Sequence, residues 1–172
     1  ILTESMPPET SQCDFIYELT GDPRFIERVG HVFTEYGSVS QQQSLEQLMA
    51  TGDLGEEEVE RRVIAILRDF PIHPHGWHNN NFFDYLKKLY ELNRSLAVDQ
   101  RVKLYFSDVP WQWEGKTKEE YELYWKTEIS KRDQIMANRI ASKFREILAS
   151  DSKRKKALVI MNTRHAFKTG GH

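Results

Sequence analysis

Cysteine is nearly absent from this sequence, since Cys13 is the single cysteine among 172 residues. A lone cysteine excludes an internal disulfide framework and a zinc site built from cysteines. The sequence also lacks an apolar run of roughly 18 residues, so we expect no membrane-spanning helix. Neither sign of charge dominates, because 24 Lys and Arg residues stand against 26 Asp and Glu residues. The resulting net charge of −2 gives no strong positive field, so we expect no nucleic-acid partner.

The composition is that of a folded chain. Hydrophobic residues make up 39% and aromatic residues 12% of the sequence, which is not typical of a disordered chain. The length predicts one domain over residues 1–172. Because the chain starts at Ile1 without methionine, we expect a trimmed chain or a piece of a longer protein. No signal peptide is visible, so a cytoplasmic protein and an exported one with its signal removed both stay open, as does the oligomeric state.

The pattern of apolar residues predicts an α/β fold. Apolar residues at helical spacing separate several short runs, and a capping box at residues 117–120 opens a long helix that ends near Ser150. Strands that alternate with helices favour a mainly parallel sheet, flanked by helices on both faces, with the long helix crossing the sheet. Four short runs rich in β-branched or aromatic residues are the predicted strands, at residues 1–4, 31–35, 102–108 and 157–162.

Polar side chains stand where the predicted strands end. Three strands end in an acid, at Glu4, Glu35 and Asp108. The fourth ends at Asn162, and His165 follows three residues later. In an open parallel sheet, ligands bind beyond the carboxyl ends of the strands. We therefore expect these side chains to converge on one edge of the sheet and to form the functional site.

The long predicted helix carries a charged pair on an apolar stripe. Arg132 and Asp133 fall within the edges of that stripe, where a charge is costly unless it has a partner. The pair is therefore either part of the functional site or a structural ion pair at a solvated edge. The apolar members of the stripe are Trp125, Ile129, Met136, Ile140 and Ile147.

These residues belong to an ordered series of short motifs: Glu4 in the opening strand, Glu35-Tyr36-Gly37 after the second, residues 132–137 in the long helix, and residues 157–160 leading to His165-Ala166-Phe167. The series resembles the erythromycin esterase-like and ChaN-like superfamily, which also includes the TraB/TIKI proteins. The helix that ends near Asn93, followed by the strand that ends at Asp108, is most similar to the erythromycin esterase-like branch. Members of that family open with Gly-Glu and a nearby histidine, whereas Met6 follows Glu4 closely here and no histidine does.

The resemblance implies a hydrolase that acts on an ester or amide of a small molecule. A carboxylate can activate water, while a second acid or a histidine protonates the leaving group. We expect Glu4 and Glu35 to be the acid/base pair, with His165, Arg132, Asp133 and Asp108 in support. An alternative is a haem- or iron-related binding protein of the same fold. A ligand-binding protein without turnover, because the opening histidine is missing, is a further alternative.

Cofactor use stays open at this stage. The favoured hydrolytic mechanism requires no cofactor, although Glu4, Glu35, Asp108 and His165 are plausible ligands for a divalent metal ion, and haem fits the binding alternative. Residues 73–78 hold three histidines, and we interpret them as a surface loop rather than a second metal cluster. The basic run at residues 153–156 predicts a surface turn rather than an RNA-binding patch. Trp111 and Trp113 are either packed on the core or an apolar wall for a bulky substrate.

Overall fold

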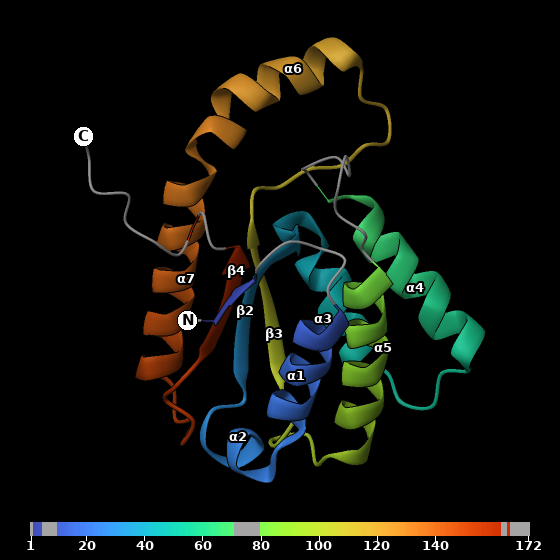
Figure 1. Ribbon diagram of the computed structural model, residues 1–172, viewed down its shortest axis with the longest axis vertical. Helices are drawn as coiled ribbons and strands as arrows, with labels where there is room; N and C mark the ends of the chain where they lie inside the picture. Colours follow the sequence, from blue (N-terminus) through green and yellow to red (C-terminus); the bar gives the residue numbers. More distant parts are fainter. Residues whose placement is uncertain (1, 5–9, 71–79, 163–164, 166–172) are drawn as a thin grey trace.

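The computed structural model describes residues 2–4, 10–70, 80–162 and 165, with side chains over 14–70, 81–162 and 165. Four strands form one sheet in the order β1-β4-β2-β3, and every neighbouring pair is parallel (Figure 1). The strands are β1 (Leu2–Glu4), β2 (His31–Ser38), β3 (Lys103–Asp108) and β4 (Leu158–Asn162). The predicted parallel sheet is therefore confirmed, and the carboxyl ends of all four strands meet at one edge.

Helices cover both faces of the sheet, as the sequence predicts. One face carries α1 (Thr10–Gly21), α3 (Gln42–Ala50), α4 (Glu56–Arg68) and α5 (Asn80–Ser95), and α7 (Arg132–Ala149) lies on the other face (Figure 1). The short α2 (Pro23–Arg28) precedes β2, and α6 (Lys118–Thr127) stands above the carboxyl edge. Two 3₁₀ turns complete the described elements, at Val39–Gln41 and Ile129–Lys131.

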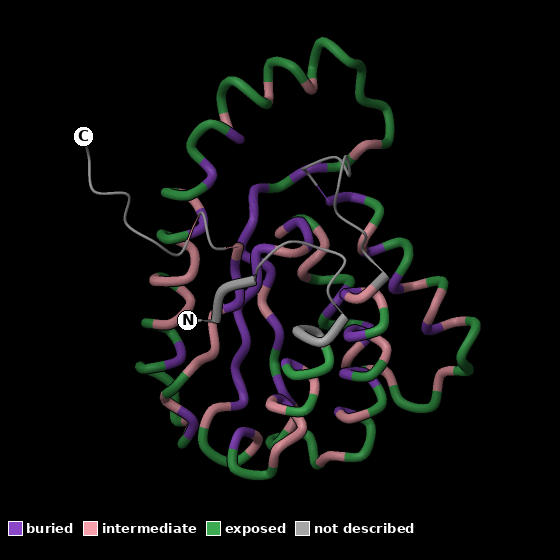
Figure 2. Tube along the Cα trace, in the orientation of Figure 1, coloured by how far each residue is buried: buried purple, intermediate pink, exposed green. Residues whose placement is uncertain are grey.

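The main core lies between the sheet and the group of four helices. Alternate strand residues such as Val32, Leu104 and Ile160 point to that core, because successive side chains of a strand face opposite sides. Their neighbours Phe33 and Val159 face α7 instead. Among the strands whose side chains are described, β2 is buried almost throughout and β3 and β4 are buried in part, whereas the helices are exposed on their outer sides (Figure 2). This arrangement explains why the runs around residues 32–33 and 157–161 are continuously apolar rather than alternating.

The long helix begins as predicted and then changes direction. The Thr117 hydroxyl accepts from the backbone N–H of Glu120 at 3.2 Å, and the Glu120 carboxylate accepts from the N–H of Thr117 at 2.9 Å, which is the predicted capping box. The 3₁₀ turn at Ile129–Lys131 interrupts residues 118–149, and α6 leaves the sheet before it. Trp125 is consequently exposed, so its predicted place on a core-facing stripe is wrong.

The basic run is not simply a surface turn. The Arg154 guanidinium is buried and donates to the carbonyls of Asp99, Gln100 and Arg101 at 2.9–3.1 Å. The Lys155 ammonium donates to carbonyls at the end of α7, where a cation suits the helix dipole. The interpretation of Arg154 as a solvated turn residue is therefore wrong, because its carbonyl partners outweigh the cost of burial.

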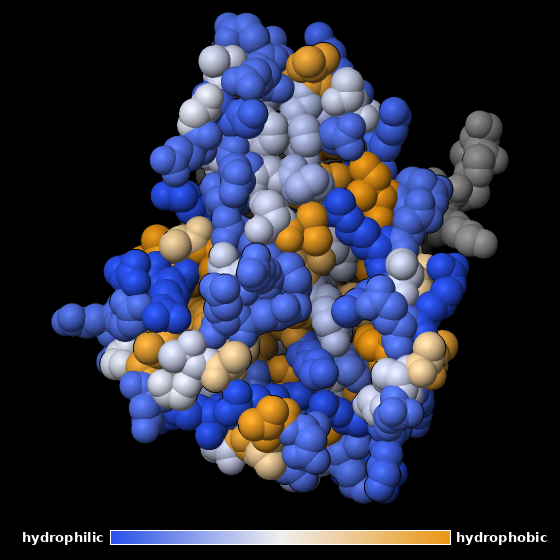
Figure 3. Space-filling view, turned by 180° about the vertical axis from the view of Figure 1, so that it is seen from behind, coloured by the Kyte–Doolittle hydropathy of each residue, from blue (hydrophilic) through white to orange (hydrophobic). Residues whose placement is uncertain are grey.

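The aromatic segment after β3 packs on the protein rather than forming a free wall. The ring of Trp111 is buried and lies 4.3 Å from the ring of Tyr124 between centroids. The backbone N–H of Trp111 donates to the Ser38 hydroxyl at 2.8 Å, which ties the segment to the end of β2. Seen from behind, the surface is mostly hydrophilic, and its hydrophobic side chains form small separate groups (Figure 3). Among the described helices, none combines the length and apolarity needed to cross a bilayer.

We predict that His31 makes the stability of the fold depend on pH. Its side chain is buried at the start of β2, and Nδ1 lies 3.1 Å from the hydroxyl of Tyr105. Burial, with the nearby charges of Arg154 and Lys103, lowers its pKa to about 4. An unfolded chain binds this proton near pH 6.5, so the free energy of unfolding falls between pH 6.5 and 4, by up to about 3 kcal/mol, and this contribution is constant above pH 6.5.

Urea unfolding at pH 7.5, 5.5 and 4.5 measures this effect. The His31→Gln variant is the control because glutamine keeps polar atoms at the position and does not titrate. The wild type should lose more stability than the variant as the pH falls. Equal losses in both proteins would show that His31 does not titrate in this range.

Candidate functional site

The structure brings five of the six predicted site residues together at the carboxyl edge of the sheet. Glu35 lies in β2, Asp108 ends β3, and Arg132 and Asp133 begin α7, while His165 follows β4. The sixth residue, Glu4, ends β1 opposite Asn162 at the same edge, and its side chain lies outside the described part of the structure. The convergence expected from the strand ends is therefore present for Glu35, Asp108 and His165, and Arg132 and Asp133 of α7 lie beside them.

A buried ion pair between Arg132 and Asp108 is the centre of the site. Nε of Arg132 donates to Oδ1 of Asp108 at 3.0 Å, and Nη2 donates to Oδ2 at 2.7 Å. Arg132 is only 9% exposed and Asp108 is fully buried. Burial alone would lower the pKa of Arg132, but the hydrogen bonds and charge of Asp108 outweigh it and raise that pKa. The paired geometry holds the guanidinium plane in one orientation.

Local structure explains why these two residues meet. The 3₁₀ turn at Ile129–Lys131 makes α7 begin at Arg132, so this side chain starts beside the strand ends. Arg139, two turns further along α7, donates from Nη1 to the carbonyl oxygen of Asp108 at 2.6 Å. Two arginines of α7 thus bind the end of β3: Arg132 binds the Asp108 carboxylate within the site, and Arg139 binds the Asp108 carbonyl.

An irregularity in β2 positions Glu35. Thr34 lies opposite Phe106 and Ser38 lies opposite Asp108, so β2 advances four residues while β3 advances two. Gly37 within this bulge has a φ of +91°, and a Cβ there would lie 2.6 Å from the Phe106 ring. Only glycine satisfies both constraints. Bulges next to active sites redirect side chains, and Glu35 lies within this one.

Glu35 is buried within this edge, at 1% exposed. Its Oε1 accepts from the backbone N–H of Asn162 at 2.6 Å, which links the ends of β2 and β4. Its Oε2 lies 3.7 Å from Nη2 of Arg132 and 3.4 Å from Nε2 of His165. Glu35 and Asp108 therefore share one guanidinium, and Glu35 also faces the imidazole.

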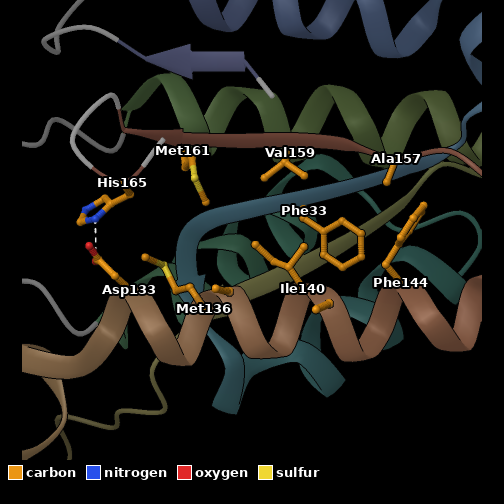
Figure 4. A pocket seen from close by; sticks show the side chains of 11 residues that line it. Phe33, Asp133, Met136, Ile140, Phe144, Ala157, Val159, Met161 and His165 are labelled. Carbon is orange, nitrogen blue, oxygen red and sulfur yellow. Dashed lines mark ion pairs between the residues drawn. The ribbon is translucent and has the colours of Figure 1, made fainter. Parts of the chain in front are cut away.

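His165 lies between an arginine and two carboxylates. Its Nε2 is 3.0 Å from Nη1 of Arg132, and its Nδ1 is 2.7 Å from Oδ1 of Asp133 (Figure 4). Because Arg132 can only donate, Nε2 must accept, and the ring proton belongs on Nδ1, facing Asp133. Burial lowers the pKa of His165, and the charge of Arg132 lowers it further, whereas Asp133 opposes both. His165 is therefore a neutral imidazole near pH 7.

A pocket of about 410 Å³ adjoins this histidine. It lies between α7 and the strands β2 and β4, and His165 and Asp133 stand at one end of it (Figure 4). Asp133 is largely exposed, in contrast to Glu35 and Asp108. The site thus combines buried charges, which fix its geometry, with an accessible imidazole at the pocket.

Part of the site was not predicted from the sequence. Arg139 was missed, although it lies seven residues from Arg132 and therefore close to the same helix face. The N–H of Asn162 could not have been found, because a backbone donor leaves no mark in a sequence. The three histidines at residues 73–78 lie outside the described residues. In the described part of the chain, no group of three or more His, Cys, Asp or Glu side chains could hold a metal ion.

Comparison with protein-family models gave no match to this chain, and neither did comparisons with curated proteins and with solved structures. The resemblance to the erythromycin esterase-like and ChaN-like superfamily consequently stays a prediction from short motifs.

We predict that Asp108→Ala destabilises the protein by about 3–5 kcal/mol, because it leaves the buried Arg132 without its main partner. Urea unfolding at pH 7.5 measures the change. The control is Glu146→Ala, which removes an exposed partner of Lys143 and should cost less than about 1 kcal/mol. A loss in Asp108→Ala as small as that of the control would mean that the buried pair does not hold the site together.

Proposed function

We propose that this protein is a hydrolase of small-molecule esters or amides in which His165 transfers the proton. The observation that carries the proposal is the placement of a neutral imidazole between Asp133 and Arg132 at the end of a pocket. A histidine held by a carboxylate on one nitrogen and unprotonated on the other can act as a general base. The motif resemblance described above favours the same class of reaction.

In the proposed first step, water attacks the substrate carbonyl carbon and gives its proton to Nε2 of His165. Asp133, 2.7 Å from Nδ1, holds the ring in the tautomer that leaves Nε2 unprotonated. Glu35, 3.4 Å from Nε2, and Asp133 both stabilise the imidazolium that forms. Collapse of the tetrahedral intermediate then returns the proton from Nε2 to the leaving oxygen or nitrogen.

Arg132 supplies the positive charge for the transition state. Its Nη1 donates to Nε2 in the resting site at 3.0 Å. The single lone pair of Nε2 accepts either from Nη1 or from the attacking water, so in the proposed step Nη1 turns from Nε2 to the developing oxyanion as water takes its place. Asp108 keeps Nε and Nη2 fixed, which is why we assign Asp108 a positioning role rather than proton transfer.

The proposal moves the proton-transfer role from the expected Glu4–Glu35 pair to His165. Glu35 is buried, and its carboxylate accepts a hydrogen bond from the backbone N–H of Asn162. In this proposal it therefore acts on the transferred proton through the imidazole of His165. The described residues give no separate role to Glu4. No metal ion or haem is required by this scheme, and the cofactor requirement stays a prediction.

We predict that Glu35→Gln lowers ester hydrolysis by roughly 100-fold or more, since it removes the negative charge beside Nε2. A panel of simple methyl and nitrophenyl esters, followed by pH-stat and absorbance, measures kcat/KM. The matched control is Glu146→Gln, the same change at an exposed position on α7, which should keep full activity. Unchanged turnover in Glu35→Gln would remove Glu35 from the mechanism, and a wild type that hydrolyses no ester or amide would overturn the proposal.

We also predict the pH dependence of that activity. The base is neutral above its pKa, and burial and Arg132 place this pKa below the ordinary value for histidine, about 6.5. Hydrolysis should therefore be constant near neutral pH and fall on the acid side with a midpoint below 6.5. In Asp133→Asn the midpoint should move to still lower pH, because the charge that raises the pKa of His165 is lost. An acid limb that stays in place in this variant would argue against His165 as the base.

A further inference from the structure

The pocket beside His165 is apolar along most of its lining and polar at one end. Nine of the eleven described residues that line it are apolar, and the two polar ones, Asp133 and His165, stand together at one end (Figure 4). Phe33 and Val159 line it from the sheet, while Ile140 lines it from α7. A cavity of about 410 Å³ is of the size that holds small organic ligands. Such a lining favours a ligand with a large apolar part and one polar end, which would face the imidazole.

Small side chains create the space. Ala137 and Ala141 are one helical turn apart on α7 and line the pocket, and Ala157 lines it from the side of β4. Residues four apart lie on the same helix face, so larger side chains at either alanine would enter the cavity. The opening between α7 and β4 is thus determined by the residue types at these positions.

The charges around the pocket select against an anionic ligand. Asp133 stands at the polar end, and no Lys or Arg is among the described residues that line the pocket. Arg132 lies nearby, but Asp108 already binds two of its nitrogens. A carboxylate or phosphate at this end would be repelled by the nearby charge of Asp133. The more compatible head group is therefore neutral.

We propose that this pocket binds a medium-length alkyl or an aryl group of a neutral ester, whose carbonyl reaches His165. The proposal rests on the hydrolase function proposed above and names its substrate class. Each methylene that the pocket removes from water strengthens binding by a factor of about four when it is fully buried. A substrate with six more carbons than an acetate should therefore gain at least roughly 50-fold in kcat/KM, even with partial burial.

Binding is tested first without turnover, using methyl ketones, which have the carbonyl and alkyl chain of an ester and cannot be hydrolysed. The 172-residue chain contains four methionines, and Met136 and Met161 line the pocket, whereas Met49 lies on the other side of the sheet in contact with Asn93. With ¹³C-methyl-labelled methionine, 2-octanone should shift the NMR signals of Met136 and Met161 and leave that of Met49 in place. We expect 2-butanone to need at least tenfold higher concentration for the same shift.

A variant pair locates the ligand. Ala141→Phe places a large side chain in the pocket and should abolish the preference for 2-octanone. Ala149→Phe makes the same change at an exposed position at the end of α7 and should retain it. The methionine spectra without ligand report whether each variant is folded, and the wild-type titration alone decides the matter if Ala141→Phe is not.

The two proposals fail in different ways. If 2-octanone shifts neither pocket methionine, or if Ala141→Phe keeps the preference while folded, the substrate class is wrong even when esters are hydrolysed. If the ketone binds as expected but methyl acetate and methyl octanoate are both stable in the presence of the protein, the pocket stands as a ligand site and the hydrolase function falls. Faster hydrolysis of methyl octanoate, lost in Ala141→Phe, supports both.

Discussion

The ion pair between Arg132 and Asp108 joins the two parts on which the site depends, the end of the parallel sheet and the start of α7. A buried arginine is tolerable only because its partner is equally buried and binds it through two nitrogens. Its third nitrogen, Nη1, then points at His165. The position of the imidazole therefore follows from a pair that does not itself take up the proton in the proposed reaction.

Glu35 shows how backbone irregularity contributes to the same site. The bulge in β2 needs a glycine at position 37, where the ring of Phe106 leaves no room for a Cβ. Beyond it the strand continues to Ser38, whose hydroxyl binds the segment after β3. The bulge thus places one carboxylate beside the imidazole and also attaches the neighbouring loop. Bulges next to functional sites commonly have such a double effect.

The pocket and the polar cluster meet at His165 and its partner Asp133. On one side of His165, buried charges determine which nitrogen carries the proton. On the other side, alanines on α7 leave a cavity that is apolar along most of its length. The proposed hydrolysis of a neutral ester would use both features, because the apolar group would provide binding free energy and the imidazole would act on the carbonyl. An apolar ligand that is not hydrolysed would use only the cavity.

The sequence by itself determined the parallel α/β architecture and the edge where the site lies. Short apolar runs that end in acids are local signals, and they located Glu35 and Asp108. The end of the last run also predicted that His165 lies at the same edge. Tertiary structure alone decided that Arg154 is buried and that Trp125 is exposed, since both depend on which element packs against them. It also decided the proton position on His165 and the pocket beside it. Those features depend on distances between groups far apart in the chain, and no local pattern of residues encodes such distances.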